Sequence, residues 1–410
     1  MVDLTPLSPG GDNGGAKIFS VELVRRLAAS RPSVQFVLLT QRASHEELAA
    51  LDAVNVRRHL AVVDGDPGSG ARRPRLARVR ALAGKLPRRV RFGLGRLRLR
   101  ASSWVERRRR RGLLRELEAD LLFCPFTSPR FAEPGVPTVC VVHDLQYRTY
   151  PQFFDPDDAL YRDATFMSAV RRASVLVAVS DYTRESVLRQ ARVDPARVRV
   201  VPHRIAKRIG FERPADPQVL RELGLLPGRY LLYPANFWRH KNHEMLLVAF
   251  GLACRDGLPV DAVLVCTGAP GDRQRYLAGA TRSMGIGDRV RFPGHVSNEA
   301  FATLLGNAGG LVFPSLYEGF GMPVVEAMVA GVPVACSNTT ALPEVVNGAA
   351  ILFDPRKPDQ MSQAMIRLLQ DVELRARLVE AGRHHAARYT DVERMMDEYW
   401  TVFEQSVAGA

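Results

Sequence analysis

One stretch of the sequence decides the fold, Leu311-Val312-Phe313-Pro314-Ser315-Leu316-Tyr317-Glu318-Gly319-Phe320-Gly321-Met322-Pro323-Val324-Val325-Glu326-Ala327-Met328. It begins as a short apolar run, passes through a loop with two glycines, and enters a helix near Pro323, because proline fits the first turn of a helix. Such a unit brings backbone N–H groups and the positive end of a helix to the carboxyl end of a strand. Open α/β sheets bind phosphates or sugar oxygens at that edge.

Apolar runs of strand length alternate with amphipathic stretches of helix length along most of the chain. Continuous apolar runs indicate strands buried on both faces, and their alternation with helices predicts a doubly wound α/β fold with parallel sheets. The expected strands, after a short one at Met1–Leu4, are Val34–Thr40, Val56–Val63, Leu121–Cys124, Thr138–Val142 and Val175–Val179, then Leu231–Pro234, Ala262–Thr267, Val290–Phe292, Gly310–Phe313, Pro333–Cys336 and Ala350–Phe353.

The two sets of strands predict two domains, as does the length of 410 residues. Pro202, Pro214 and scattered charges interrupt the pattern between Val201 and Asp216, so we place the boundary there. The last helix, from about Asp391, has no strand after it, and we expect it to cross back to the first domain.

The net charge of +14 is concentrated in an insert at about 66–115. Between Arg72 and Arg115 the chain carries 17 Arg and one Lys against one acid, a charge of +17, so the remainder carries −3. Part of the insert is a basic amphipathic stretch, interrupted at Pro87, of the type that lies on anionic membrane surfaces. We expect membrane contact. The alternative is that the insert is only a solvated segment, and nucleic acid is not the expected partner.

The rest of the composition fits a cytoplasmic protein, at most peripheral on the inner face of the membrane. The five cysteines, an odd number without metal-ligand spacing, indicate buried thiols in a reducing compartment. The sequence contains no run of 18 apolar residues, and Met1–Gly15 lacks the basic start and apolar stretch of a signal peptide.

Two carboxylates in the opening stretch are candidate ligand-binding groups. Glu326 falls about one turn into the expected helix, where it can accept hydrogen bonds from two vicinal hydroxyls such as those of a ribose. Glu318 lies on the preceding loop and can reach the next part of the same ligand. The alternative is a helix carboxylate favoured by the macrodipole, together with an ordinary loop acid.

Glu318 and Glu326 form an E-x7-E pattern with Gly319-Phe320-Gly321 inside it. This pattern closely resembles the retaining glycosyltransferases of the GT-B fold called group 1 or family 4, and the likeness covers most of 225–390. Further blocks with this likeness are Tyr233–Asn242, Phe292–Val296 and Ala341–Val345, with patchier ones at Gly10–Lys17 and Val142–Asp144.

The resemblance implies two Rossmann-like domains facing a cleft: an acceptor-binding domain over 1–207 and a donor-binding domain over 208–390, with a helix over 391–410 packing on the first. It also implies transfer of a hexose from a nucleoside diphosphate sugar to a glycan or polyprenyl-linked acceptor in surface polysaccharide biosynthesis. GDP-mannose is favoured over UDP-sugars, because Phe237–His243 and Leu342–Val345 look like mannosyltransferases of the group.

The resemblance also implies residue roles in the second domain. Glu326 would hold the donor ribose, and Lys241, with Arg239 as a nearby candidate, would contact the diphosphate and neutralise the leaving group. The family's usual second diphosphate-binding Arg aligns near Asn236, which departs from the pattern. The remaining contacts would come from Glu318, Gly319 and the backbone of Phe320, Gly321 and Met322 for the sugar, and from the backbone of His295 and Val296 for the base.

The first domain contributes three further candidates. Gly14 and Gly15 lie in a loop ahead of a helix, where a substrate can approach the backbone closely. Lys17 adds a positive charge at the helix start, unless it is an ordinary solvated lysine. His143 directly follows the strand Thr138–Val142 and can hydrogen-bond the donor sugar or the acceptor. A structural histidine is the alternative.

The expected chemistry involves His143, Lys241 and Glu318, and neither glutamate of the pattern is an obvious nucleophile for double displacement. The resemblance implies a front-face substitution in which the leaving phosphate accepts the acceptor's proton. We expect neither a metal nor another cofactor. The alternatives are a nucleotide-sugar epimerase or a glycan phosphorylase on the same fold, and a membrane- or nucleic-acid-binding protein that uses the α/β body as a scaffold.

Overall fold

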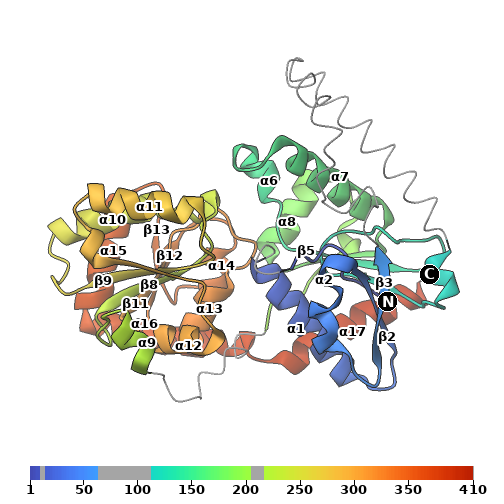
Figure 1. Ribbon diagram of the computed structural model, residues 1–410. Helices are drawn as coiled ribbons and strands as arrows, with labels where there is room; N and C mark the ends of the chain where they lie inside the picture. The colour runs from blue at the N-terminus through green and yellow to red at the C-terminus, as the bar shows by residue number, and fades with distance from the viewer. Residues whose placement is uncertain (10–13, 63–111, 205–216, 410) are drawn as a thin grey trace, which may run out of the picture. The chain divides into compact units, whose positions relative to one another are not determined.

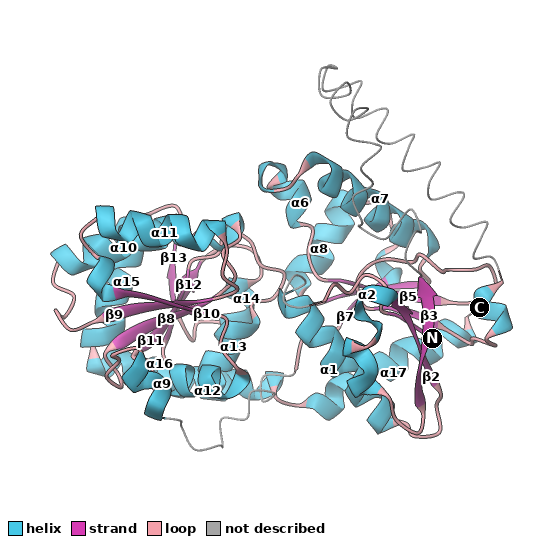
Figure 2. Ribbon diagram, in the orientation of Figure 1, coloured by secondary structure: helices cyan, strands magenta, loops and turns pink. Residues whose placement is uncertain are grey.

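The computed structural model describes residues 1–9, 14–62, 112–204 and 217–409. Unit 1 comprises Met1–Val179, Thr183–Val201 and the chain from Met396, and unit 2 comprises Ser180–Tyr182 and Pro202–Met395. Figures 1 and 2 show a layer of strands with helices around it in each unit. Residues 66–111 of the expected basic insert lie outside the described residues.

Unit 1 contains a parallel sheet that has, within the described ranges, seven strands in the order β3-β2-β1-β4-β5-β6-β7. These strands are β1 (Val2–Asp3), β2 (Phe36–Gln41), β3 (Val56–Val62), β4 (Leu122–Cys124), β5 (Thr138–Val142), β6 (Val175–Ala178) and β7 (Val198–Val200). Most of β2, β4, β5 and β6 is buried, as the apolar runs predict.

Strand β7 was not expected from the sequence. It has three residues, and only Val198 is buried while Arg199 is exposed. A short edge strand packs on one neighbour and needs no continuous apolar run, so its pattern is too weak to be recognised.

The helices of unit 1 cover the sheet and connect its strands. They are α1 (Gly14–Ser30), α2 (Arg42–His45), η1 (Glu47–Leu51), α5 (Leu113–Glu116), α6 (Gln146–Thr149), η3 (Pro151–Phe153), α7 (Pro156–Arg172), α8 (Asp181–Gln190) and η4 (Pro195–Arg197). Helix α17 (Val392–Ala408) contributes its residues from Met396 on: the Tyr399 and Phe403 rings meet Phe123 at 5.8 and 5.1 Å, and the Trp400 indole donates a hydrogen bond of 2.9 Å to Ser30.

Unit 2 contains a second parallel sheet, in which the described residues form six strands in the order β10-β9-β8-β11-β12-β13. The strands are β8 (Tyr230–Pro234), β9 (Val263–Thr267), β10 (Val290–Gly294), β11 (Gly310–Phe313), β12 (Val334–Ser337) and β13 (Ile351–Phe353). Each expected strand of this set is present within one or two residues of its predicted bounds.

The helices of unit 2 lie on both faces of its sheet. They are α9 (Pro217–Glu222), η6 (Arg239–Lys241), α10 (His243–Arg255), α11 (Asp272–Ser283), η7 (Gly287–Arg289), α12 (Asn298–Gly306), α13 (Met322–Val329), α14 (Leu342–Val346), α15 (Pro358–Gln370), α16 (Val372–Ala386) and η8 (Ala387–Tyr389). Figure 1 shows α10 and α11 on one face and α9 and α12 on the other. Right-handed crossovers send α10 and α11 to one face and α12 and α13 to the other, because the chain moves one way through β8, β9 and β10 and the other way through β11, β12 and β13.

Gly268 lets the loop after β9 approach the loop after β8. A Cβ atom at Gly268 would lie 2.5 Å from the Ala235 carbonyl oxygen, and the Gly268 φ is +154°. The N–H of Gly268 donates to the Gly294 carbonyl at 2.9 Å. Three adjacent strands therefore end in loops whose backbones are packed together.

We predict that Gly268→Ala lowers the free energy of unfolding by about 1–3 kcal/mol, because the methyl group collides with backbone that cannot rotate away. Gly279→Ala is the matched control: Gly279 lies in α11, and its added Cβ would meet nothing closer than 3.9 Å. This control is expected to gain up to about 1 kcal/mol from helix propensity. Urea denaturation of the two variants measures the difference, and equal stabilities would contradict the close approach.

Candidate active site

The candidate active site of unit 2 lies where the order of its strands reverses. β8 pairs with β9 on one side and with β11 on the other. The connection after β8 leads to α10 and the connection after β11 leads to α13, which belong to opposite faces of the sheet. Diverging loops at the carboxyl ends of neighbouring parallel strands form the usual ligand position of a doubly wound sheet.

The loop after β8 is held by Asn242, which connects it to the ends of two other strands. The Asn242 side chain donates hydrogen bonds to the carbonyls of Pro314 and Pro355, at 3.1 and 2.8 Å. Its φ is +61°, a left-handed conformation that asparagine tolerates better than most residues. This side chain therefore joins the loops after β8, β11 and β13.

Lys241 and Glu318 meet across the reversal point. The Lys241 Nζ lies 2.5 Å from the Glu318 Oε1, and each side chain is 13% exposed. The ammonium also lies 5.4 Å from the centre of the Phe313 ring. The two residues that the sequence analysis assigned to the diphosphate and the sugar are thus in direct contact, and their charges compensate each other.

Backbone hydrogen bonds fix the loops that carry this ion pair. The Leu316 N–H donates to the His240 carbonyl at 2.8 Å, and the Tyr233 hydroxyl donates to the Lys241 carbonyl at 2.6 Å. The Glu318 N–H donates to the Thr340 hydroxyl at 3.1 Å. The backbone of both residues is therefore held by neighbouring groups in addition to the ion pair.

Helix α13 begins at Met322, one residue before the expected start. Gly321 precedes it with a φ of +103°, and an added Cβ would lie 2.6 Å from a methyl group of Leu342. Glycine is therefore required at the entrance to the helix. Glu326 lies in the second turn of α13 and is only 1% exposed, so its carboxylate is more deeply placed than the sequence indicated.

The remaining candidates of unit 2 lie on neighbouring loops. Arg239 opens η6 and is exposed, as is His295 after β10, whereas Val296 is half-buried. Asn236, where the family pattern has an arginine, accepts a hydrogen bond of 2.9 Å from the Ala269 N–H. Its side chain therefore holds the loop after β9.

Two histidines beside Lys241 were not recognised from the sequence. Burial, followed by the charge of Lys241, lowers the pKa of His240 to about 2. Burial, followed by the charge of Arg273, lowers the pKa of His243 to about 3, and its ring lies 4.7 Å from that of Tyr233 and 4.8 Å from that of Phe237. Both are neutral near pH 7, so they add no positive charge beside the lysine. The feature of the sequence that could have indicated these histidines is their position on either side of Lys241-Asn242.

In unit 1 the strand order reverses between β1 and β4, and the candidate residues lie near this point. Gly14 is the first residue of α1, with a φ of +53°, and Gly15 follows it within the helix. The expectation that both glycines lie in a loop was wrong. A left-handed φ is accessible to glycine without strain, so the chain can turn at Gly14 as it enters the helix.

Lys17 is not an ordinary solvated lysine. Its Nζ lies 2.6 Å from the Glu47 Oε1 and donates to the Ser8 carbonyl at 2.9 Å. These contacts connect α1 to the loop after β1, which contains Ser8, and to η1, which contains Glu47. Like Lys241, it is held by a glutamate.

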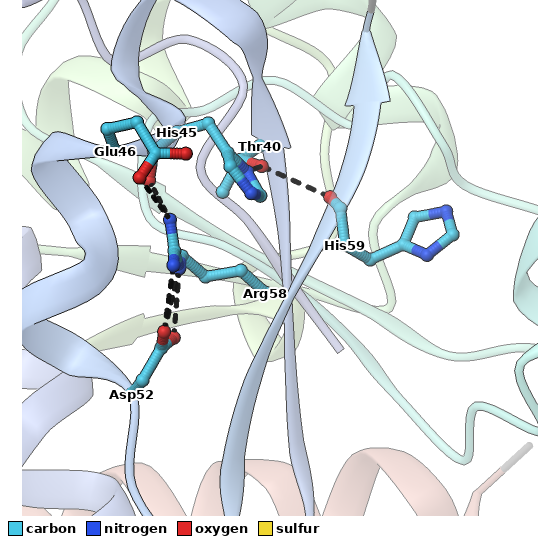
Figure 3. Close-up of polar contacts among 6 residues, drawn as sticks. All are labelled: Thr40, His45, Glu46, Asp52, Arg58 and His59. Atoms are coloured by element: carbon cyan, nitrogen blue, oxygen red, sulfur yellow. Dashed lines mark hydrogen bonds and ion pairs between the residues drawn. The ribbon is translucent and has the colours of Figure 1, made fainter.

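Figure 3 shows what holds η1, which carries Glu47, in place. Arg58 on β3 pairs with Asp52 through its Nη2 at 2.9 Å, and its Nη1 lies 4.0 Å from Glu46. Asp52 and Glu46 flank η1 on either side, so one guanidinium holds both ends of the turn. Thr40 supports the same region by hydrogen bonds with the His45 ring and the His59 carbonyl.

His143 lies at the carboxyl end of β5, as expected. Its Nε2 is 2.8 Å from the Pro125 carbonyl, and its ring lies 6.0 Å from that of Phe19 on α1. Burial lowers the pKa of His143, so the ring is neutral near pH 7. A carbonyl only accepts, so Nε2 carries the proton and Nδ1 is the acceptor nitrogen.

Among the residues that the structure describes, no group of three or more His, Cys, Asp or Glu side chains could hold a metal ion. The helices in these parts of the chain are all too short or too polar to cross a membrane.

Comparison with protein families identifies the class of this protein. Residues 222–385 match the model of glycosyl transferases group 1, and residues 13–205 match that of glycosyltransferase family 4. O-antigen chain mannosyltransferase B of Escherichia coli is 31% identical over 272 residues, which span 65% of this chain and 69% of the relative. The chain belongs to the group 1 glycosyl transferases.

Solved structures show the same architecture. Sucrose-phosphate synthase from Thermosynechococcus elongatus has a TM-score of 0.71 at 19% identity, covering 97% of this chain and 94% of that one. Anabaena HepE in complex with UDP and glucose has a TM-score of 0.69 at 16% identity, covering 98% of both chains. These similarities establish the fold. The protein is a glycosyltransferase of the GT-B fold, as the E-x7-E pattern predicted.

We predict that the buried neutral histidines make stability fall in mild acid. Their folded pKa values lie below the unfolded value of about 6.5, so below that pH the unfolded chain binds protons that the folded chain does not. The stabilisation of the folded protein that comes from these neutral histidines is fully present above about pH 6.5. It is lost as the pH falls toward the folded pKa values. The slope is about 1.4 kcal/mol per pH unit for each such histidine.

Urea unfolding of wild type and His243→Gln between pH 7 and pH 5 measures this effect. Unfolding of the variant is expected to take up about one proton fewer than unfolding of wild type. The slope of its unfolding free energy against pH is therefore smaller by about 1.4 kcal/mol per pH unit. Parallel slopes would show that His243 is not a neutral group in the folded protein.

Proposed function

We propose that this glycosyltransferase transfers a hexose from a nucleoside diphosphate sugar with retention of anomeric configuration. The observation that carries the proposal is the Lys241–Glu318 pair at the reversal point of the unit 2 sheet, with Glu318 on the loop that leads into α13. A cation and helical N–H groups suit a diphosphate, and a carboxylate in contact with the cation suits the hydroxyls of the adjoining sugar.

In this proposal, different residues of unit 2 bind different parts of the donor. Lys241, with Arg239 nearby, neutralises the diphosphate as negative charge develops on the leaving group. Glu318 and the segment Gly319–Met322 bind the hydroxyls of the transferred sugar. Glu326 accepts hydrogen bonds from the ribose, and the backbone at His295–Val296 contacts the base.

The chemistry we propose is a front-face substitution. The bond from the anomeric carbon to the diphosphate breaks while the acceptor oxygen adds on the same face, and the departing phosphate takes the acceptor's proton. Lys241 stabilises the charge on that phosphate. Being neutral and donating its one N–H to Pro125, His143 accepts a hydrogen bond at Nδ1 from a hydroxyl of the donor sugar or of the acceptor. We propose that Gly14, Gly15 and Lys17 also contact the substrate.

Mannose is the sugar we favour, with GDP-mannose as donor and a glycan or polyprenyl-linked chain of a surface polysaccharide as acceptor. The name of the Escherichia coli relative, an O-antigen chain mannosyltransferase, supports this choice. UDP-sugars remain the second candidates, and the UDP and glucose bound to HepE support testing them.

The test of function is a panel of GDP- and UDP-sugars offered with and without a glycan acceptor. We expect transfer from GDP-mannose, and NMR of the product is expected to show the same anomeric configuration as the donor. An inverted product would contradict retention. Conversion of the donor into another sugar in the absence of acceptor would favour the epimerase.

The site assignment predicts different effects for two variants. Glu326→Gln, which keeps the volume of this buried side chain, is expected to raise the donor Kd by about tenfold through loss of a charge-assisted hydrogen bond. Lys241→Met is expected to lower kcat by roughly 100-fold and to change the donor Kd less, because the charge it neutralises grows in the transition state.

Lys357→Met is the matched control, because Lys357 is an exposed lysine of the same unit. Calorimetric titration and initial rates measure the three variants. Wild-type rates in Lys241→Met would overturn the assignment of the lysine.

The basic segment Arg72–Arg115 supports a further part of the proposal, contact with an anionic membrane surface that carries the acceptor. Deletion of Arg72–Arg111 is expected to abolish co-sedimentation with vesicles containing anionic lipid and to leave donor binding unchanged. Loss of donor binding, or vesicle binding that persists, would contradict this division of tasks.

A further inference from the structure

The proposed diphosphate ligand, Lys241, is already held by an anion of the protein. Its Nζ lies 2.5 Å from the Glu318 carboxylate, and both side chains are 13% exposed. An ion pair at this distance and burial is more weakly screened than one on the open surface. A diphosphate that binds Lys241 must therefore replace the carboxylate as its partner or share the ammonium with it.

Hydrogen bonds hold the backbone of Lys241 and of Glu318, so only their side chains move when an anion competes for the ammonium. The Lys241 N–H donates to the Trp238 carbonyl at 3.0 Å, and its own carbonyl accepts from the Tyr233 hydroxyl. The Glu318 N–H is held by Thr340, and its carbonyl accepts from the Ala341 N–H at 3.4 Å. Because both backbones are fixed, the Glu318 carboxylate stays near any anion that reaches Lys241.

The two ligands that this site meets differ in how they treat that carboxylate. A nucleotide sugar carries hydroxyls that can donate to Glu318 once the lysine has turned to the diphosphate. A free nucleoside diphosphate lacks the hydroxyls of the transferred sugar, and its terminal phosphate loses a second proton near pH 6, so it carries about one more negative charge. The nucleotide sugar can therefore donate hydrogen bonds to the Glu318 carboxylate, whereas the carboxylate repels the free nucleoside diphosphate.

We propose that Glu318 determines the preference of the site for the nucleotide sugar over the free nucleoside diphosphate product, by competing for Lys241. The carboxylate disfavours the product and so promotes its release after transfer. This inference rests on the proposed function, because it takes Lys241 as the diphosphate ligand and a nucleotide sugar as the donor.

The experiment compares Glu318→Gln with wild type in calorimetric titrations with GDP and with GDP-mannose, and in product-inhibition kinetics. The variant is expected to bind GDP about tenfold more tightly, because the repulsion is removed and the lysine is released from its partner. Affinity for GDP-mannose is expected to stay constant or fall, because a hydrogen-bond acceptor weakens. The ratio of the GDP inhibition constant to the donor KM is therefore expected to drop by about tenfold or more.

Two further variants separate this role from general effects. Glu373→Gln removes one exposed carboxylate from the same unit and is expected to leave both affinities unchanged. In a Lys241→Met background, Glu318→Gln is expected to tighten GDP binding less, because only the repulsion is removed and there is no ammonium to release. Glu318→Asp keeps the charge and is expected to bind GDP more weakly than Glu318→Gln does.

The outcomes distinguish this inference from the proposed function. If wild type binds GDP-mannose and Glu318→Gln, folded by its melting temperature, binds GDP no more tightly, Glu318 merely positions the lysine and the inference is wrong. Equal tightening in the Lys241→Met background also overturns it, because the effect is then independent of the pair. If wild type binds neither GDP-mannose nor a UDP-sugar, the proposed function fails first.

Discussion

Strand β8 pairs with β9 on one side and with β11 on the other, and the rest of unit 2 depends on this arrangement. Right-handed crossovers then send α10 and α13 to opposite faces, so the loops that lead into them diverge. Lys241 comes from the first loop and Glu318 from the second. The two residues are 77 positions apart in the chain, and the pairing of β8 with β11 places them 2.5 Å from each other.

Each unit holds a lysine beside the point where its strand order reverses, and each lysine is paired with a glutamate. Lys17 also bonds to the Ser8 carbonyl, and its partner Glu47 lies on a turn braced by Arg58. That lysine joins structural elements to one another. Lys241 instead pairs with Glu318, which lies on the loop that leads into α13. The two lysines therefore both pair with a glutamate but join different elements: Lys17 joins α1 to the loop after β1 and to η1, and Lys241 joins the loops after β8 and β11.

The central strands were predictable because burial on both faces demands continuous apolar runs, which β5 and β11 display. The E-x7-E stretch was predictable for a local reason, since a strand, a glycine turn and a helix follow directly in the chain. Strand β7 escaped prediction because an edge strand with one buried face leaves a weak pattern. The helical start at Gly14 escaped because glycine at a loop-helix border fits either state, and packing decides between them.

The sequence by itself determined the α/β class, the six strands of unit 2, the family, and the residue types at the carboxyl ends of β5, β8 and β11. Those features depend on local periodicity and on residues close together in the chain. Only the tertiary structure decided that Lys241 is paired with Glu318, that Glu326 is buried, and that His240 and His243 are neutral. The reason is physical: ion pairing and desolvation depend on what strand pairing and packing bring near a charge, and neighbours in sequence do not specify it.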